Sequence, residues 1–272
     1  MNIIDTQSFA IRKYLTVTRW SAVFRICISF IATLIVFSRC ESYGLKEKLE
    51  NPGGTNKSND PCSDTGIGIV KSGLVGFWAF NGNLDDNWDC GSGLQPGTGT
   101  TFGFAADRFG TGGNAVDLVA NTGKVQFGNL PIFSNPPLTF CSWIRPTSAG
   151  LVFPVAKFLT GNGYQIRVNN GAISLEIGIQ GTFPVSIGTG MTAGTWNFAC
   201  VTYDGATAVG YTGQYGGALI SGSAAAGGYV APAASLDLNA ATSFAVQFDD
   251  MLFYNRVLSA TEVQRNFQSS GQ

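Results

Sequence analysis

Residues 166–175 read IRVNNGAISL. Apolar and polar residues alternate on both sides of Asn170-Gly171, and such alternation places the apolar side chains of a strand on one face. An Asn-Gly pair adopts positive φ at little cost, which suits the tight turn of a β-hairpin. This stretch therefore predicts two antiparallel strands.

The same pattern continues on both sides of this hairpin, from Gly73 onward. Short apolar runs alternate with turn residues, as in a sandwich or barrel. A second tight turn is expected at Asp204-Gly205, and a mobile hairpin or loop at residues 213–234, which are rich in Gly, Ala and Ser. Strands are predicted at residues 74–80, 115–119, 123–127, 138–145, 152–158, 164–168, 172–179, 185–187, 196–203, 207–212 and 244–254.

One short helix is predicted near the C-terminus. Ser259 and Glu262 have the spacing of a capping box, in which each side chain accepts a hydrogen bond from the other residue's backbone N–H. Val263 and Phe267 follow at i, i+4 and form an apolar stripe. We expect the helix to dock on the sandwich through these two side chains.

Composition supports a folded β domain. Of the 272 residues, 44% are hydrophobic, 12% are charged and 36 are glycine, which suits short strands and excludes a disordered chain. The length fits one sandwich of about 200 residues plus a leader. The chain contains no histidine, which excludes a Ser-His-Asp triad, histidine zinc sites and histidine general bases.

The first 39 residues have the features of a signal peptide. Basic residues precede an apolar run at 26–37, which is too short for a comfortable transmembrane span. The run leads into Ser38-Arg39-Cys40, which resembles a bacterial lipoprotein signal and implies lipidation of Cys40. Arg39 departs from that pattern, which favours a small residue before the cysteine. The alternatives are an uncleaved signal anchor and ordinary cleavage nearby.

Residues 40–71 contain few apolar residues and several Pro, Gly and Asn residues, so they are predicted to be a flexible tether before a domain at 72–270. Five of the 16 basic residues lie in the leader, and residues 40–272 hold the other 11 with 16 acidic residues. A mildly acidic chain without a basic patch gives no electrostatic reason to expect nucleic acid as a partner.

Four cysteines remain after Cys27 of the leader and Cys40 are set aside: Cys62, Cys90, Cys141 and Cys200. An even number suits two disulfides in an oxidising compartment. The alternative is that they are small buried apolar residues. A zinc site is disfavoured because no Cys-x-x-Cys spacing occurs.

Four phrases, in order along the chain, resemble laminin-G/pentraxin domains of the concanavalin A-like lectin/glucanase superfamily. They are GLVGFWAFNGNLDD (73–86), PLTFCSWIRP (137–146), AGTWNFACVTYDG (193–205) and FDDMLFYNRVLSATEVQRNF (248–267). The resemblance implies an all-β jelly-roll sandwich of two antiparallel sheets whose first and last strands pair. Pentraxins bridge the strands that match the second and third phrases, which implies the disulfide Cys141–Cys200 and leaves Cys62 with Cys90.

A calcium site is one expectation from this resemblance, because related domains frequently hold calcium. If the first and last strands pair, the polar loop after the first strand lies near the acidic residues of the last one. Hard cations take several oxygen ligands at once. The alternative is that these side chains form turns and cap backbone groups. The candidate ligands are Asn81, Asn83, Asp85, Asp86, Asp249 and Asp250.

Aromatic residues fall into two groups. Trp78, Trp143 and Trp196 lie in predicted strands beside alternating apolar residues and are expected in the core. A second group lies in or near predicted loops, where exposed rings can stack on sugars. For Trp88 the alternative is packing on a Cys62–Cys90 bridge. The candidate ligand contacts are Trp88, Tyr164, Tyr211 and Tyr215, with Tyr229 as a further loop tyrosine.

A glycosidase is disfavoured, although glucanases share this jelly roll. Such enzymes need two carboxylates facing each other across the sugar. The predicted domain contains only two glutamates, Glu176 and Glu262, and the second belongs to the capping box. Asp249 and Asp250 are adjacent in a predicted strand, so their side chains are expected on opposite faces.

The leading hypothesis is therefore a non-catalytic binding module for a glycan or an extracellular or host glycoprotein. It is expected to be anchored by lipid to the bacterial envelope, at the outer membrane or cell surface or in the periplasm. This function rests on likeness of fold, which indicates a class of ligand and not its identity. The alternatives are a structural envelope protein without a dedicated ligand and, third, a glycoside hydrolase.

Overall fold

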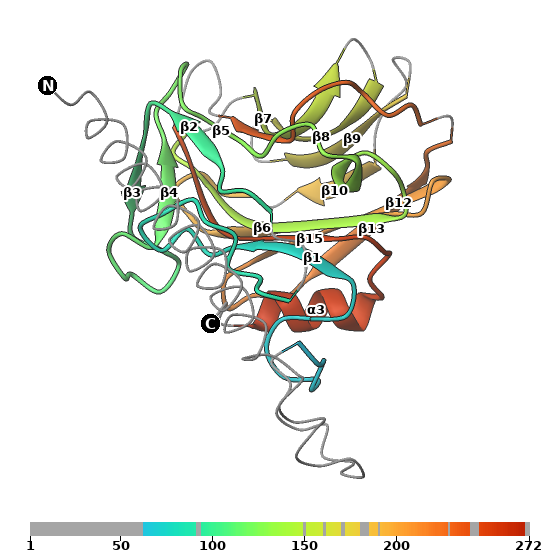
Figure 1. Cartoon of the computed structure of the whole chain (residues 1–272), viewed down its shortest axis with the longest axis horizontal. Coiled ribbons are helices and arrows are strands. Elements are labelled where there is room, and N and C mark those ends of the chain that lie inside the picture. Colours follow the sequence, from blue (N-terminus) through green and yellow to red (C-terminus); the bar gives the residue numbers. More distant parts are fainter. Residues whose placement is uncertain are drawn as a thin grey trace, which may run out of the picture. The chain divides into compact units, whose positions relative to one another are not determined.

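The computed structural model shows two antiparallel β-sheets packed face to face (Figure 1). They belong to a folded unit within Ser58–Gln272. The structure describes residues 62–90, 94–148, 151–159, 162–169, 172–179, 185–189, 191–227, 229–239 and 245–269. The predicted signal peptide, Cys40 and residues 40–61 of the predicted tether lie outside the described residues, so lipidation of Cys40 stays a prediction.

The first sheet contains eight strands. Its order is β13-β12-β11-β6-β15-β4-β3, and β1 pairs with the second half of β15. In chain order the strands are β1 (Leu74–Trp78), β3 (Phe102–Ala105), β4 (Ala115–Leu118), β6 (Leu138–Pro146), β11 (Asn197–Tyr203), β12 (Thr207–Gln214), β13 (Ile220–Ala225) and β15 (Val246–Tyr254).

The second sheet contains seven strands in the order β10-β9-β8-β7-β14-β5-β2. The pairing of β8 with β9 confirms the hairpin that the Asn-Gly sequence predicts. In chain order the strands are β2 (Thr98–Thr100), β5 (Lys124–Gln126), β7 (Leu151–Leu159), β8 (Asn162–Asn169), β9 (Ala172–Ile179), β10 (Val185–Thr189) and β14 (Asp237–Asn239).

The first and last strands pair, as the resemblance implies. In β1 and β15, Phe77 lies opposite Leu252 and Trp78 lies opposite Met251. On its other side β15 pairs with β6, with a bulge between Asp249 and Leu252. The all-β two-sheet sandwich is therefore confirmed. The sequence did not predict β2, β3 and β14, which have only three or four residues each, and it gave β13 only weak strand character.

The central strands of the first sheet are buried on both faces. Its inner face and the second sheet enclose an inner core that includes Trp78, Phe140, Phe248 and Phe253. Its outer face carries a second, outer cluster. The outer cluster contains Val70, Leu74, Phe77, Ala79, Ala115, Cys141, Trp143, Trp196, Phe198, Cys200, Tyr211, Leu252, Tyr254, Leu258, Val263 and Phe267. The expectation that the three strand tryptophans are core residues is confirmed, but only Trp78 lies between the sheets.

Helix α3 (Ala260–Gln268) covers part of the outer face, with the 3-10 helix η2 (Pro131–Phe133) elsewhere in the domain. The predicted capping box is present: the Ser259 side chain accepts from the Glu262 N–H, and the Glu262 side chain accepts from the Ser259 N–H. Val263 and Phe267 are buried in the outer cluster, as predicted. Among the residues that the structure describes, no helix is long and apolar enough to span a bilayer.

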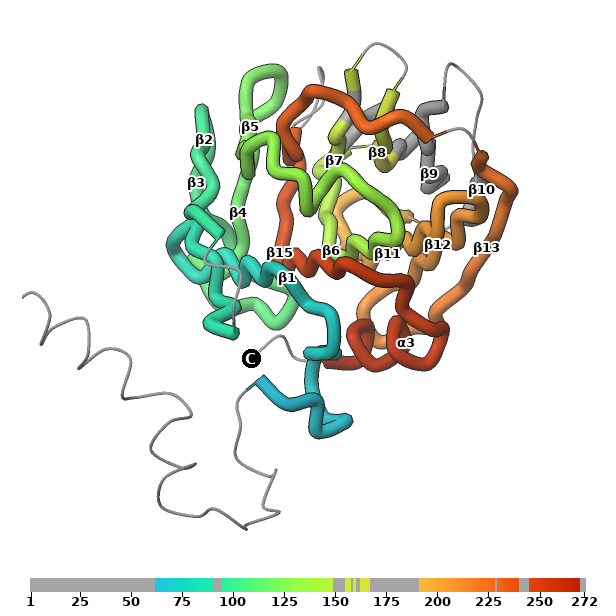
Figure 2. Tube along the Cα trace, turned by 45° about the vertical axis from the view of Figure 1, so that its right-hand side comes forward, coloured from blue at the N-terminus to red at the C-terminus, as the bar shows by residue number. Residues whose placement is uncertain are grey.

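Residues 62–71, which we call the arm, run beside α3 (Figure 2). The Val70 N–H donates to Asn266 Oδ1 at 2.8 Å, and Arg265 Nη2 lies 2.6 Å from Asp64 Oδ1. The arm is therefore bound to the domain, although the sequence analysis placed these residues in the tether.

Both disulfides join the predicted partners. Cys141 and Cys200 lie directly opposite each other on β6 and β11, and Cys62 is bonded to Cys90 in the loop after β1. The first bridge fixes two strands inside the outer cluster, and the second fixes the start of the arm.

Candidate functional site

The outer face of the first sheet is partly exposed beyond the end of α3. Phe267 of α3 stacks on Trp143 of β6, with ring centroids 5.5 Å apart. Farther along the same face, Arg145, Gln247 and Asp117 are only partly buried. This exposed part of the outer face is the candidate site, because it combines polar side chains with aromatic rings in one place.

A buried ion cluster forms the floor beside Trp143. Arg108, in the loop between β3 and β4, contacts Asp249 Oδ2 through Nη1 at 2.5 Å and Asp250 Oδ2 through Nη2 at 2.6 Å. The three side chains are 1%, 5% and 7% exposed. Nη2 of Arg108 also donates to the Ser269 backbone oxygen at 3.3 Å. The cluster thus ties a loop, a strand and the end of α3 together.

The expectation that Asp249 and Asp250 point to opposite faces is wrong. The bulge in β15 lies at these residues, and Asp250 has a φ of +47°, in the left-handed region. A bulge inserts an extra residue and interrupts the alternation of side chains. Both carboxylates therefore reach Arg108 on the outer face. They remain a poor hydrolytic pair, because both are buried against one guanidinium instead of facing each other across a sugar.

Burial dominates the electrostatics of this acidic pair. Burial raises the pKa of Asp249, while the charge and hydrogen bonds of Arg108 oppose the rise. Burial also raises the pKa of Asp250, and the neighbouring charge of Asp249 raises it further. Two carboxyl groups therefore share one arginine, and both hold their protons more tightly than an exposed aspartate does.

Two exposed aromatic side chains, Phe109 and Tyr215, lie together above this cluster. We call them the aromatic pair. Their rings meet edge to face at 5.5 Å, and they are 44% and 55% exposed. The Tyr215 ring also lies 6.0 Å from Trp143, and the Arg108 guanidinium lies 4.4 Å from the Phe109 ring. Exposed rings held in place by buried partners can stack on an apolar ligand face without much ordering cost.

The loop that carries Phe109 is held by its own hydrogen bonds. Asp107 Oδ1 accepts from the Phe109 and Thr111 N–H groups, each at 2.8 Å, and the Asp107 N–H donates to Thr111 O at 3.0 Å. Gly110 and Gly113 have φ of +87° and +84°, which glycine adopts at no steric cost. The loop therefore presents Phe109 in a defined position.

Tyr215 lies in the turn between β12 and β13. Its N–H donates to Trp196 O at 3.4 Å. The same turn forms an open hollow of about 250 Å³, which is lined by Thr212, Gly213, Gln214, Gly217, Ala218 and Ile220.

The other aromatic candidates lie elsewhere. Tyr164 is 5% exposed within β8, and Tyr211 is 7% exposed within β12, so the expectation that they are exposed in or near loops is wrong. Tyr164 faces the inner core, and Tyr211 is buried in the outer cluster. Trp88 is half-buried against the outer cluster, and Tyr229 packs on the inner core. Tyr215 is the candidate that the structure leaves exposed beside a second ring.

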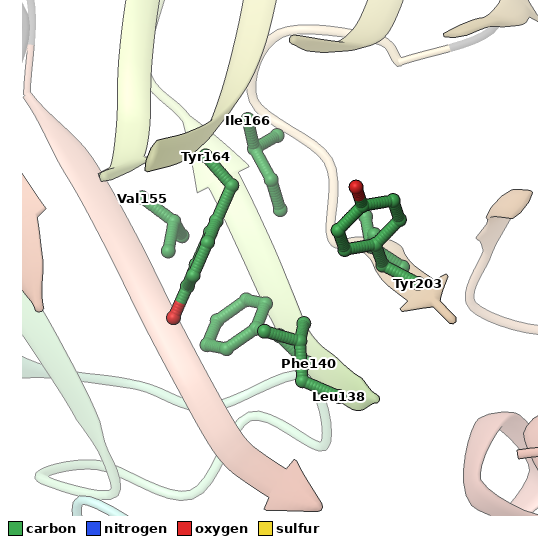
Figure 3. Close-up of a pocket in the computed structure, with 7 residues that line it drawn as sticks. Leu138, Phe140, Val155, Tyr164, Ile166 and Tyr203 are labelled. Carbon is green, nitrogen blue, oxygen red and sulfur yellow. The ribbon is translucent and has the colours of Figure 1, made fainter. Parts of the chain in front are cut away.

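Figure 3 shows where Tyr164 lies. With Phe140, Val155 and Tyr203 it borders an apolar void between the sheets of about 10 Å³. Such a volume holds about one water molecule. The Tyr164 hydroxyl donates to Phe133 O at 3.0 Å, away from solvent. This void is a packing feature and cannot admit a sugar.

The predicted calcium ligands have other partners. Asp249 and Asp250 contact Arg108, whereas Asp86 Oδ1 accepts from the Phe77 and Trp88 N–H groups at 2.9 and 3.0 Å. Asn83 Oδ1 accepts from the Asp85 N–H at 3.1 Å, and Asn81 and Asp85 are exposed. Within the described ranges, no three acidic, Cys or His residues gather as metal ligands. The hydrogen bonds match the turn-forming alternative, and calcium stays a prediction.

Sequence reasoning missed Arg108 and Phe109. The phrase ADRFGTGG (106–113) contains a turn signal, but nothing local indicates which strand its side chains contact. Arg108 is 141 positions from Asp249, and the pairing becomes visible only when β4 lies beside β15.

The chain is similar in sequence to one known protein family. A sequence model described as the Concanavalin A-like lectin/glucanases superfamily matches residues 119–264. No curated protein matches the chain by sequence.

Several solved structures share the fold. The binding domain of Paraclostridial Mosquitocidal Protein 1 has a TM-score of 0.57 and 15% identity, over 72% of this chain and 52% of its own. Domain 4 of an extracellular arabinanase from Geobacillus stearothermophilus, in complex with arabinotriose, has a TM-score of 0.56 and 17% identity, over 72% and 98%. The binding domain of Botulinum Neurotoxin DC in complex with SialylT has a TM-score of 0.55 and 13% identity, over 74% and 52%. This chain spans about half the length of the two binding domains.

Proposed function

The chain belongs to the Concanavalin A-like lectin/glucanases superfamily, and from this premise we propose that it is a non-catalytic glycan-binding module. The observation that carries the proposal is the aromatic pair, Phe109 and Tyr215, which is exposed yet held over Trp143 and Arg108. Aromatic faces and edges are the surfaces on which sugar rings stack. Two structures of the same fold were determined in complex with saccharides, arabinotriose and SialylT.

A glycan array of the purified full chain tests the proposal. We expect binding to a restricted set of glycans, and loss of that binding in Tyr215→Ala and Phe109→Ala. Both residues are exposed, so the two variants should keep the melting temperature of the parent within a few degrees. Binding that persists in both variants would move the site elsewhere. Silence across glycans and glycoproteins would favour the alternative of a structural envelope protein.

We further propose that the module is held at the bacterial envelope by lipid on Cys40, with the arm as its attachment. The proposal is supported by the apolar run at 26–37 and by the disulfide that fixes the arm at Cys62. Mass spectrometry of the mature protein should show an acylated N-terminal cysteine. A mature chain that begins at another residue without lipid would contradict it.

Calcium is the remaining proposal from the family resemblance. A melting scan with and without EDTA tests it, because a ligand that binds the folded state raises its melting temperature. An unchanged midpoint would remove calcium from the description of the site.

A further inference from the structure

Three polar side chains form one row across the exposed part of the outer face. Gln247 of β15 lies opposite Asp117 of β4 on one side and opposite Arg145 of β6 on the other. Strand neighbours of these residues, Val116 and Phe248 among them, point into the inner core. Because side chains alternate along a strand, Asp117, Gln247 and Arg145 all point outward. We call them the polar row.

The row ends two residues along β6 from Trp143, whose ring lies 6.0 Å from the ring of Tyr215. Arg145 Nε donates to Gly194 O at 3.0 Å, in the turn before Trp196. Trp196 O in turn accepts from the N–H of Tyr215. At the other end, Gly103 of β3 lies opposite Asp117. The row therefore runs from an edge strand toward the exposed ring of Tyr215.

Hydrogen-bonding capacity is left over along this row. Gln247 Oε1 accepts from Arg145 Nη1 at 3.3 Å. Among the described residues, the Gln247 amide hydrogens and Arg145 Nη2 have no partner, and Asp117 Oδ1 is buried without one. A hydroxyl both donates and accepts, so a polyhydroxyl ligand can pair with all three side chains.

The charges of this face favour a neutral ligand. Among the described residues in and beside the row, two arginines, Arg108 and Arg145, accompany four aspartates, two of which hold their protons tightly. Arg108 is 1% exposed and both of its terminal nitrogens are engaged, so it cannot bind an incoming anion. Across Gln247, Arg145 faces the charge of Asp117. The four aspartates are Asp107, Asp117, Asp249 and Asp250.

The length of the row sets the size of the ligand. Strands β3, β4, β15 and β6 are consecutive neighbours. Three strand spacings amount to about 14 Å, the length of roughly three sugar rings. A ligand lying along the row would cross the strands and end at Tyr215.

We propose that this site binds a neutral, linear oligosaccharide, with its hydroxyls on Asp117, Gln247 and Arg145 and a terminal ring against the aromatic pair. The inference rests on the proposed glycan binding and adds the ligand class and the residues that read it. The proposed site only binds its ligand. The row lies on an exposed face, and among the described residues no acid faces a base across it.

Gly103 offers a steric test of this geometry. A Cβ at Gly103 would meet no atom within 4 Å, so a side chain can leave the backbone there without a clash, next to Asp117 at the end of the row. Gly227 is a matched control, because a Cβ there also meets nothing. It follows β13 at the end of the β12–β13 hairpin opposite Tyr215.

The experiment uses the full chain on an array of neutral oligosaccharides of one to six rings together with sialylated, sulfated and uronic-acid glycans. The strongest printed glycan is then titrated in solution. We expect neutral glycans to bind, with a signal that rises up to about three rings. Gly103→Trp should weaken binding about tenfold or more, as should Gln247→Ala, whereas Gly227→Trp should not.

The outcomes separate the two proposals. If no glycan binds, both fail. If the strongest ligands are acidic, if binding is independent of length, or if Gly103→Trp binds like the parent, the row is not the site. Glycan binding itself then stands whenever Tyr215→Ala or Phe109→Ala removes it. Melting temperatures of the two glycine variants should match that of the parent. If only Gly103→Trp has a lower melting temperature, the binding of Gln247→Ala decides whether the row is the site.

Discussion

The two faces of the first sheet bury different chemistry. The inner face meets the second sheet through side chains such as Phe140, Phe248 and Phe253, which contribute only apolar area. The outer face buries Trp143 and a disulfide but also Arg108 with its acidic pair. Apolar burial is non-directional, whereas buried charges require specific partners.

This difference separates stability from recognition. A substitution on the inner face removes area from a core that touches no ligand. A substitution on the outer face changes where a loop or a helix end lies relative to the exposed rings. Substitutions on the two faces therefore should differ in what they change.

Phe253→Ala tests the inner face. Phe253 is fully buried and meets Phe133 edge to face at 4.9 Å. Truncation of such a side chain leaves a cavity, and we expect the free energy of unfolding to fall by about 3–5 kcal/mol. Urea unfolding measures it. Tyr215→Ala on the outer face should change the same quantity by less than about 0.5 kcal/mol. Equal losses of unfolding free energy in the two variants would contradict the division between the two faces.

Arg108→Met tests the buried ion cluster. Removing one partner leaves Asp249 and Asp250 without their cation, and we expect the free energy of unfolding to fall by about 3 kcal/mol near neutral pH. The loss should be smaller near pH 5, because burial raises the pKa of both carboxyls and protonation removes the unpaired charge.

Arg145→Met is its control on the same face. Arg145 is partly exposed, so its removal should cost less than about 1 kcal/mol. A loss for Arg108→Met that is small and independent of pH would show that the cluster is not needed to hold the loop.

Sequence alone predicted the features that depend on local signals. The capping box of Ser259 and Glu262 and the β8–β9 hairpin follow from neighbouring residues, and the structure confirms both. The pairing of β1 with β15 and the two disulfides came from the family resemblance and are also confirmed.

The candidate site depends on contacts that no local signal encodes. Asp249 and Asp250 share a face because of a bulge, and a regular strand would separate them. Phe109 meets Tyr215 only because the β3–β4 loop crosses the outer face. Tyr164 begins a predicted strand and is expected in or near a loop, but its burial in β8 removes it from the site. Tertiary packing therefore decides which aromatic rings are exposed.

Loss of the Cys62–Cys90 bridge tests how the outer face is covered. The bridge closes a loop with a sequence separation of 28, and replacing both cysteines by serine should lower the free energy of unfolding by about 2–3 kcal/mol. Hydrogen exchange should accelerate at the Val70 N–H, which bonds Asn266 Oδ1. Exchange at inner-face amides such as that of Phe253 should accelerate only as much as the lower free energy of global unfolding requires. Uniform acceleration would show that the arm is not a separate covering unit.

The smallest expected effect is a difference in pH dependence between two ionic groups on the outer face. The Arg256 hydrogen bond lowers the pKa of Glu262 to about 2 against the effect of burial. A lowered pKa contributes stability above the ordinary glutamate range, and that stability is lost as the pH falls toward 2. The pKa of Asp250 is raised, so its contribution is present at low pH and is lost as the pH rises above the ordinary aspartate range.

Two isosteric variants separate these slopes. Glu262→Gln keeps an acceptor for the capping box but loses the ion pair, which is 28–29% exposed, and should cost less than about 1 kcal/mol at pH 7 and nothing near pH 2. Asp250→Asn should flatten the decline of stability between about pH 4 and pH 8, since an amide does not titrate and the pKa of Asp250 is raised to about 8. Thermal melting from pH 2 to pH 9 measures both. If both substitutions changed the pH dependence of stability in the same direction, the pKa of Asp250 would not be raised while that of Glu262 is lowered.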